Sequence, residues 1–184
     1  MLPRASDFKV NDKVVHPQYG GGHVDGIESI QVGGEAIECL KIRCVSKDRK
    51  IFVPRGSEEL AAIRPPMSTG RFRLLRKTLT AAPEELHRNF NRRMKQVKSK
   101  IESGDPLQIG EVLRDLYPRW SVNSLSTSDQ RIFEKTRDLL VSEIALIRDS
   151  SYDEAVAYLD KTMANARNGA KAMASAKNGA IRRA

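Results

Sequence analysis

Residues 13–53 of this 184-residue chain read KVVHPQYGGGHVDGIESIQVGGEAIECLKIRCVSKDRKIFV, and this stretch decides the fold. It contains short runs of β-branched and apolar residues that end at glycine or proline, a pattern typical of strands joined by tight turns. Gly33-Gly34 predicts a two-residue hairpin, and Gly20-Gly21-Gly22 predicts a tight reversal of the chain.

The side chains of residues 35–45 alternate in character, as they do in a strand with one buried face. Leu40, Ile42 and Cys44 would lie on one face, and Lys41 and Arg43 on the other. Five such short strands with glycine corners in about 60 residues predict a small, strongly bent sheet or barrel. The prolines at 65 and 66 mark the end of this region, because proline disfavours helix in the residue before it.

After residue 67 the apolar residues recur at helical spacing. Three places carry residues that begin helices: Asp105 before Pro106, Ser126 before Asp129, and Ser151 before Glu154. We therefore expect helices at 72–82, 84–103, 106–117, 126–148 and 151–163. The chain is predicted to be an α+β protein of two domains, a small bent β-sheet or barrel followed by an all-α bundle of four or five helices.

The net charge of +9 is distributed unevenly. Residues 68–100 contain 10 basic and 2 acidic side chains, whereas residues 101–160 contain 6 basic and 12 acidic ones. A clustered basic segment is the electrostatic signature of a polyanionic partner, which in the cytoplasm is most often nucleic acid. A solvated helix face would explain the same cluster without a partner.

The last twenty residues form a basic tail with a near-repeat around Asn168-Gly169 and Asn178-Gly179. Each Asn-Gly pair interrupts helix, and no large apolar stripe is available to dock the segment. We expect a disordered tail over 165–184, after a β domain over 1–66 and a helical domain over 67–164. Its positive charges would contact phosphates without forming a specific site.

Several function classes find no support in the sequence. No run of about 18 apolar residues is present, which predicts no membrane span, and the N-terminus has no apolar region typical of a signal peptide. His16, His23, Cys39 and Cys44 could converge, but their spacing matches no standard zinc site, so we expect no metal and no cofactor. No phosphate-binding loop or nucleophile motif is present, and we expect no enzymatic activity. The two cysteines suit a reducing cytoplasm.

Six phrases of the sequence resemble the CarD/CdnL family of bacterial RNA polymerase-binding transcription regulators: FKVNDKVVHP at 8–17, VDGIE at 24–28, FVP at 52–54, NFNRR at 89–93, SGD at 103–105 and EVLRDL at 111–116. LS at 125–126 and AL at 145–146, after LLVSE at 139–143, also fit the family. The order and spacing of all these phrases extend the resemblance over residues 8–163, and the tail lies outside it. The family shares its N-terminal domain with the polymerase-interacting domain of the transcription-repair coupling factor. The resemblance implies a Tudor-like β domain that binds the polymerase β subunit and a helical domain that binds upstream promoter DNA.

The resemblance also implies a DNA-binding face in the helical domain. Family members stabilise the open promoter complex with a tryptophan wedge in the minor groove, and Phe90 occupies the matching position here. An apolar wedge holds bases unstacked while basic side chains hold phosphates, so sequence readout is weak. The matching basic residues are Arg88, Arg92, Arg93, Lys95 and Arg119. Phe90 also shares a helical stripe with Met94 and Val97, and it could belong to the core instead.

At the polymerase-binding face, this sequence departs from the family. Two arginines that contact polymerase in well-known members are replaced here by Ile30 and Phe52. The interface could be apolar, or could use Arg43, Arg49 or Arg55 instead. The alternative is a divergent paralogue that acts as a protein–protein adaptor or DNA-binding protein without the standard polymerase contact. Trp120 lacks the context of the family's wedge, and we expect it to pack or to lie at an interface.

Overall fold

The computed structural model describes residues 8–46, 49–87 and 89–181, with side chains as far as Ala166. The chain forms two compact units. One contains the chain up to Ser68 together with Asp138–Ala155, and the other contains Thr69–Arg137 and the chain from Val156 onward. The α+β class is confirmed, but residues 138–155, which the sequence pattern places in the helical domain, are part of the unit that contains the sheet.

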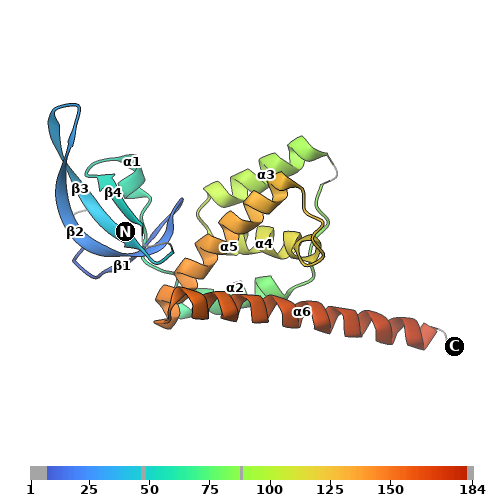
Figure 1. Cartoon of the computed structure of the whole chain (residues 1–184). Helices are drawn as coiled ribbons and strands as arrows, with labels where there is room; N and C mark the ends of the chain where they lie inside the picture. Colours follow the sequence, from blue (N-terminus) through green and yellow to red (C-terminus); the bar gives the residue numbers. More distant parts are fainter. Residues whose placement is uncertain (1–7, 47–48, 88, 182–184) are drawn as a thin grey trace. The chain divides into compact units, whose positions relative to one another are not determined.

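The first unit is built on an antiparallel sheet (Figure 1). Its strands pair in chain order: β1 (Lys13–His16), β2 (Gly20–Val32), β3 (Glu35–Cys44) and β4 (Lys50–Pro54). The hairpin at Gly33-Gly34 is confirmed, and both glycines have positive φ, 61° and 91°. The described part of the chain thus has four strands where five are predicted. A register shift between Val24 and Gly26 interrupts the pairing of β2 with β3.

The buried face of the sheet carries the core of this unit. The predicted alternation is confirmed, because Leu40, Ile42 and Cys44 are buried and Arg43 is exposed. A short helix, α1 (Glu58–Ala61), adds Leu60 to this core. Its N-cap Ser57 accepts a hydrogen bond from the Leu60 amide, which satisfies one of the free donors at the helix start.

The three glycines at 20–22 lie in β2, not in the reversal, which occupies residues 17–19. Gly20 and Gly21 allow the strand to approach the C-terminal half of α5 (Thr127–Arg148), whereas Gly22 faces Ile42 and Arg43 of β3. The Gly21 amide donates to Ser142 Oγ at 2.8 Å, and a Cβ on Gly21 would lie 2.6 Å from the Ser142 carbonyl oxygen. Only residues without a side chain fit this contact.

A buried carboxylate joins the same part of α5 to the end of the β region. Glu143 is 2% exposed and accepts two hydrogen bonds from the Arg64 guanidinium, at 2.7 and 2.8 Å. It also accepts a hydrogen bond from the Met67 amide at 2.7 Å. These three hydrogen bonds offset the free-energy cost of removing the Glu143 carboxylate from water. The contact holds residues 64–67 against the helix.

The buried ring of His16 should make the stability of the protein depend on pH. Its ring is 2% exposed, Nδ1 accepts from the Gln18 amide, and Nε2 lies 2.9 Å from Glu59 Oε1. Burial lowers the pKa of His16, and this outweighs the raising effect of Glu59. The unfolded chain, with an ordinary histidine pKa, therefore binds more protons below about pH 6.5, and stability falls as the pH falls.

We expect the urea midpoint of unfolding to decrease from about pH 7.5 to about pH 5.5, and His16→Gln to reduce this decrease. A midpoint that rises on acidification would contradict this assignment.

The second unit is helical. Its elements are α2 (Thr69–Thr80), α3 (Phe90–Glu102), α4 (Pro106–Trp120), the first half of α5 and α6 (Tyr152–Ile181) from Val156 onward. The predicted starts of α4, α5 and α6 are confirmed by side-chain caps: Asp105 accepts from the Leu107 amide, Ser126 from the Asp129 amide and Ser151 from the Glu154 amide. No helix in the described residues is long and apolar enough to cross a membrane.

Packing in this unit uses close helix contacts and stacked rings. A Cβ on Gly110 of α4 would lie 2.6 Å from Leu75 Cδ1 of α2. The absence of a side chain at Gly110 therefore lets Leu75 pack directly against α4. Trp120 stacks on Phe133, with ring centroids 4.9 Å apart and planes inclined by 18°. The packing role expected for Trp120 is confirmed.

The predicted helix over 84–103 is wrong in its first turns, because α3 begins at Phe90. The Glu84 amide donates to Asp115 Oδ1 at 2.8 Å, and the Glu84 carboxylate pairs with Arg114 at 3.3 Å. These contacts to α4 hold the segment before α3 in a non-helical conformation. Glu84 and Glu85 therefore do not begin a helix, whereas Glu58 and Glu59 do.

α6 continues to Ile181, through the Asn-Gly pairs where the sequence pattern predicts disorder. Alanine, the strongest helix former, surrounds both pairs and offsets the weak helix propensity of glycine, about 1 kcal/mol per residue. Arg182 and Arg183 lie outside the described residues.

Candidate functional site

The residues that the sequence singles out lie on two surfaces, one in each unit. The first surface is at the start of α3, where Phe90 is the first helical residue. Asn89 caps the helix, and its side chain accepts a hydrogen bond from the Arg92 amide at 3.1 Å. Because Phe90 precedes the stripe that packs inward, its ring is 49% exposed. Phe90 is therefore not a core residue, and Val97, two turns later, is buried.

The Arg93 guanidinium contacts the exposed ring of Phe90. Its guanidinium carbon lies 5.4 Å from the centre of the Phe90 ring, within the range of a cation–π contact. The same guanidinium donates to the His87 carbonyl at 3.2 Å and lies 3.4 Å from the buried Asp129 carboxylate. Only 12% of the Arg93 side chain is exposed. Arg93 thus holds the ring and the preceding loop, and its charge is already paired within the protein.

The other basic residues of this surface differ in their surroundings. Arg92 and Lys95 are exposed and form no ion pair within the part of the chain that the structure describes. Arg119 is exposed in the last turn of α4, and no hydrogen bond or ion pair in the described ranges joins it to α3. Arg88 lies outside the described residues. We call Phe90, Arg92, Arg93 and Lys95 the α3 surface.

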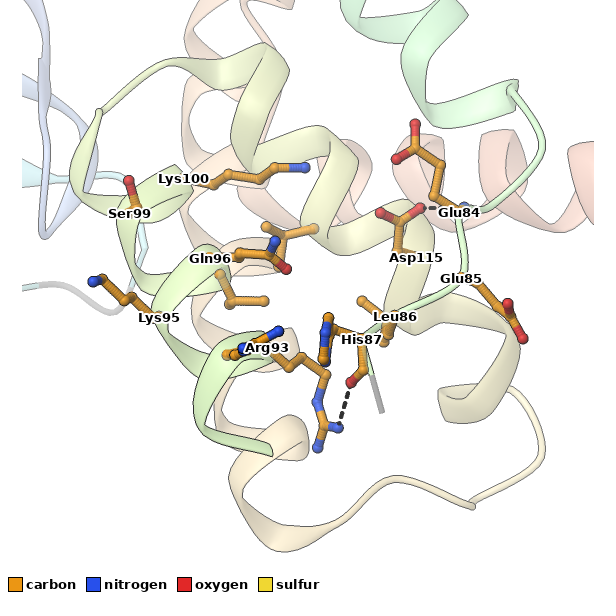
Figure 2. Close-up of a pocket in the computed structure, with 13 residues that line it drawn as sticks. Glu84, Glu85, Leu86, His87, Arg93, Lys95, Gln96, Ser99, Lys100 and Asp115 are labelled. Carbon is orange, nitrogen blue, oxygen red and sulfur yellow. Dashed lines mark hydrogen bonds between the residues drawn. The ribbon is translucent and has the colours of Figure 1, made fainter. Parts of the chain in front are cut away.

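A hollow of about 760 Å³ lies beside the α3 surface. Figure 2 shows Lys95, Gln96 and Lys100 of α3 on one side and Glu84, Glu85 and His87 of the preceding loop on the other. Several of its charges are already paired, since Lys100 contacts Glu111 at 2.8 Å and Asp115 contacts Arg114 at 2.7 Å. The charges left toward solvent are Arg92, Lys95 and the Glu85 carboxylate, so the balance of the hollow is positive on the α3 side and negative at the loop.

The second surface is the outer face of the sheet, opposite the core. The register places Ile30 opposite Ile37 and Phe52 opposite Lys41, and alternation along β3 puts all four side chains on this face. Phe52 is 38% exposed, and Lys41 Nζ lies 5.6 Å from the centre of its ring. Lys41 also pairs with Glu28 at 2.5 Å. The two positions that differ from the family thus lie on the same face of the sheet, with the Lys41–Glu28 ion pair between them.

The sequence suggests three arginines as alternative polymerase contacts, and each of them has a different neighbour in the structure. Arg43 lies on this face but pairs with Asp25 at 3.2 Å, and Arg55 follows β4 and pairs with Glu38 at 2.7 Å. Arg49 lies over the ring of Tyr19, 5.7 Å from its centre. The cations on this unit are therefore mostly engaged by neighbours. We call Ile30, Ile37, Lys41 and Phe52 the outer sheet face.

His23 lies opposite Arg43 on the same side of the sheet. Burial lowers the pKa of His23, and the positive charges of Arg43 and Lys13 lower it further. The histidine therefore adds no positive charge to this face at neutral pH. No group of three or more metal-binding side chains is found among the described residues.

Sequence reasoning missed two members of the outer sheet face, Ile37 and Lys41. The alternation over 35–45 places Lys41 on the outer side, so that signal was present in the sequence. The pairing of Ile30 with Ile37 was also implied by a hairpin centred on Gly33-Gly34.

Comparison with known families matches both parts of the chain. Residues 8–67 match the CarD-like/TRCF RID domain, and residues 75–160 match the CarD C-terminal domain. A protein of Bacillus subtilis (strain 168), named "Putative transcription factor YdeB", is 22% identical over 141 residues, which cover 77% of this chain and 92% of that protein.

Proposed function

The chain belongs to the CarD-like family of transcription regulators, and from this premise we propose that it binds the RNA polymerase β subunit through its sheet-containing unit and upstream promoter DNA through its helical unit. The result of both contacts would be a more stable open promoter complex. The observation that carries this proposal is Phe90, an exposed aromatic ring at a helix start beside Arg92 and Lys95, two cations without an ion pair among the described residues.

The DNA contact follows from the chemistry of the α3 surface. Unstacking a base step costs a few kcal/mol, and an inserted apolar side chain offsets that free energy. Phe90 supplies the apolar side chain, Arg93 fixes its position, and Arg92 and Lys95 can contact the flanking phosphates. Such contacts carry little base information, so we expect weak sequence specificity.

The polymerase contact would use the outer sheet face. Ile30, Ile37 and Phe52 give partly exposed apolar side chains, and the Lys41–Glu28 ion pair lies between Ile30 and Phe52, so the face offers apolar and charged contacts together. In this proposal apolar burial replaces the charge-assisted hydrogen bonds that arginines at positions 30 and 52 would make. The protein would act at the nucleoid in the cytoplasm, without a cofactor and without enzymatic activity.

Replacing Phe52 tests the polymerase contact. We expect Phe52→Glu in the full chain to weaken binding to the purified polymerase β subunit by about tenfold or more, since truncating a central interface anchor commonly has that effect. The measurement is a titration of labelled protein with the β subunit.

Ile27→Glu is the matched control. Ile27 of β2 is 51% exposed but pairs with Leu40, so it lies on the face of the sheet opposite to Phe52. Its variant should bind as the wild type does. Equal losses in both variants would show that the outer sheet face is not the interface. Absence of binding by the wild type would favour the adaptor without standard polymerase contact.

A further inference from the structure

We propose that α2 carries a second phosphate-binding surface, separate from the α3 surface, that contacts the sugar–phosphate backbone of duplex DNA. The proposed surface consists of Arg73, Arg76 and Lys77. It extends the proposed function in that both need the helical unit to meet DNA, but it does not depend on the wedge at Phe90.

The arrangement of α2 leaves these cations free. Leu75 and Leu79 are buried, Leu75 against Gly110 of α4, and the ring of Phe72 lies 6.0 Å from that of Tyr158 of α6. The opposite side of the helix is left to solvent. Arg73, Arg76 and Lys77 are all exposed there.

The positive charge of α2 is balanced only in part by the residues that the structure describes. The helix has four basic residues and no acidic residue along its twelve positions. Arg71 pairs with Asp105 at 2.7 Å, whereas Arg73, Arg76 and Lys77 form no ion pair with any residue that the structure describes. On α3, by contrast, Lys98 pairs with Glu102 and Lys100 with Glu111.

The spacing of these cations is unfavourable for the helix itself. Arg73 and Lys77 are four residues apart, and Arg73 and Arg76 are three apart, so like charges lie next to each other on one side of the helix. An external polyanion relieves this repulsion. The rise between Arg73 and Lys77 is about 6 Å, and each strand of B-DNA presents one phosphate per about 3.4 Å of helix axis. The three cations can therefore meet two or three neighbouring phosphates.

The surface is separate from the α3 surface because the two helices use different residues of α4. Leu75 of α2 meets Gly110, whereas Val112 lines the hollow beside α3. Contact with phosphates at both places would hold a duplex over a longer length than the wedge alone. The chemistry recognises phosphate and not base edges, so this contact should be independent of sequence.

The test compares two double variants of the full chain on DNA. Arg73→Gln with Lys77→Gln removes two charges from α2, and Arg131→Gln with Lys135→Gln removes two exposed charges with the same spacing from α5. Binding to a blunt, unrelated duplex and to a forked promoter fragment is measured over a range of salt concentrations.

We expect the α2 variant to bind both DNAs about tenfold more weakly, and the slope of log affinity against log salt to decrease by about two. The α5 variant should keep the wild-type slope. The proposal is overturned if the α2 variant keeps the wild-type salt slope. It is also overturned if the α5 variant lowers the slope as much as the α2 variant does.

Phe90→Ala separates this proposal from the proposed function. The wedge acts only where bases are unstacked, so its loss should weaken binding to the fork and spare the blunt duplex. If only the α2 variant loses affinity, the α2 surface stands and the wedge fails. If only Phe90→Ala loses affinity, the wedge stands and the α2 surface fails.

Discussion

Phe90→Ala should shorten the lifetime of the open promoter complex by about thirtyfold while leaving the unfolding of the free protein nearly unchanged. The lifetime falls because the apolar side chain no longer offsets unstacking, a contribution of about 2 kcal/mol. Stability should change little because half of Phe90 is already exposed and the higher helix propensity of alanine offsets part of the lost packing. The measurement is the decay of preformed complexes after a competitor is added, together with thermal unfolding of the protein alone.

Two further variants sharpen this prediction. Val122→Ala removes a side chain that is 61% exposed in the same unit, and it should leave the lifetime unchanged. Phe90→Trp places the family's residue at the helix start and should preserve the complex. A lower unfolding temperature for Phe90→Ala would show that the ring is structural, and a normal lifetime would remove it from the DNA interface.

Gly21→Val should have the largest effect on stability, a loss of about 3 kcal/mol or more in the free energy of unfolding. A Cβ at this position would lie 2.6 Å from the Ser142 carbonyl oxygen and 2.8 Å from Leu146 Cδ1. The strand and α5 would have to separate, which also weakens the hydrogen bond from the Gly21 amide to Ser142 Oγ. Chemical denaturation of the full chain measures this loss.

Gly33→Asn is the control for the glycine substitution. Gly33 has a φ of 61°, which asparagine tolerates, and no atom lies within 4 Å of a Cβ built there. This variant should unfold within about 0.5 kcal/mol of the wild type. If Gly21→Val were equally neutral, the close contact between β2 and α5 would be contradicted.

Local sequence signals were sufficient for most elements. The hairpin at Gly33-Gly34, the alternation around Leu40 and the caps at Asp105, Ser126 and Ser151 all act within a few residues along the chain. Turn and capping preferences depend on short-range sterics and hydrogen bonds, and the sequence alone contains these.

The candidate surfaces could be predicted only in part. The sequence singles out Phe90 as a candidate, but its helical stripe leaves open whether the side chain is buried. The answer depends on where α3 begins, and that is decided by the contacts of Glu84 with Asp115 and Arg114, about thirty residues further on. Arg93 was grouped with the phosphate contacts, yet it is engaged by Asp129 and the His87 carbonyl.

The sequence by itself determined the α+β class, the hairpin, the starts of three helices and the concentration of positive charge over 68–100. Only the tertiary structure decided that residues 138–155 belong with the sheet and that Gly20–Gly22 serve close packing. The Gly21–Ser142 contact joins residues 121 positions apart. Local propensity has no information at that distance, because such a pairing is selected by the fit of two complete surfaces and by the burial of their apolar side chains.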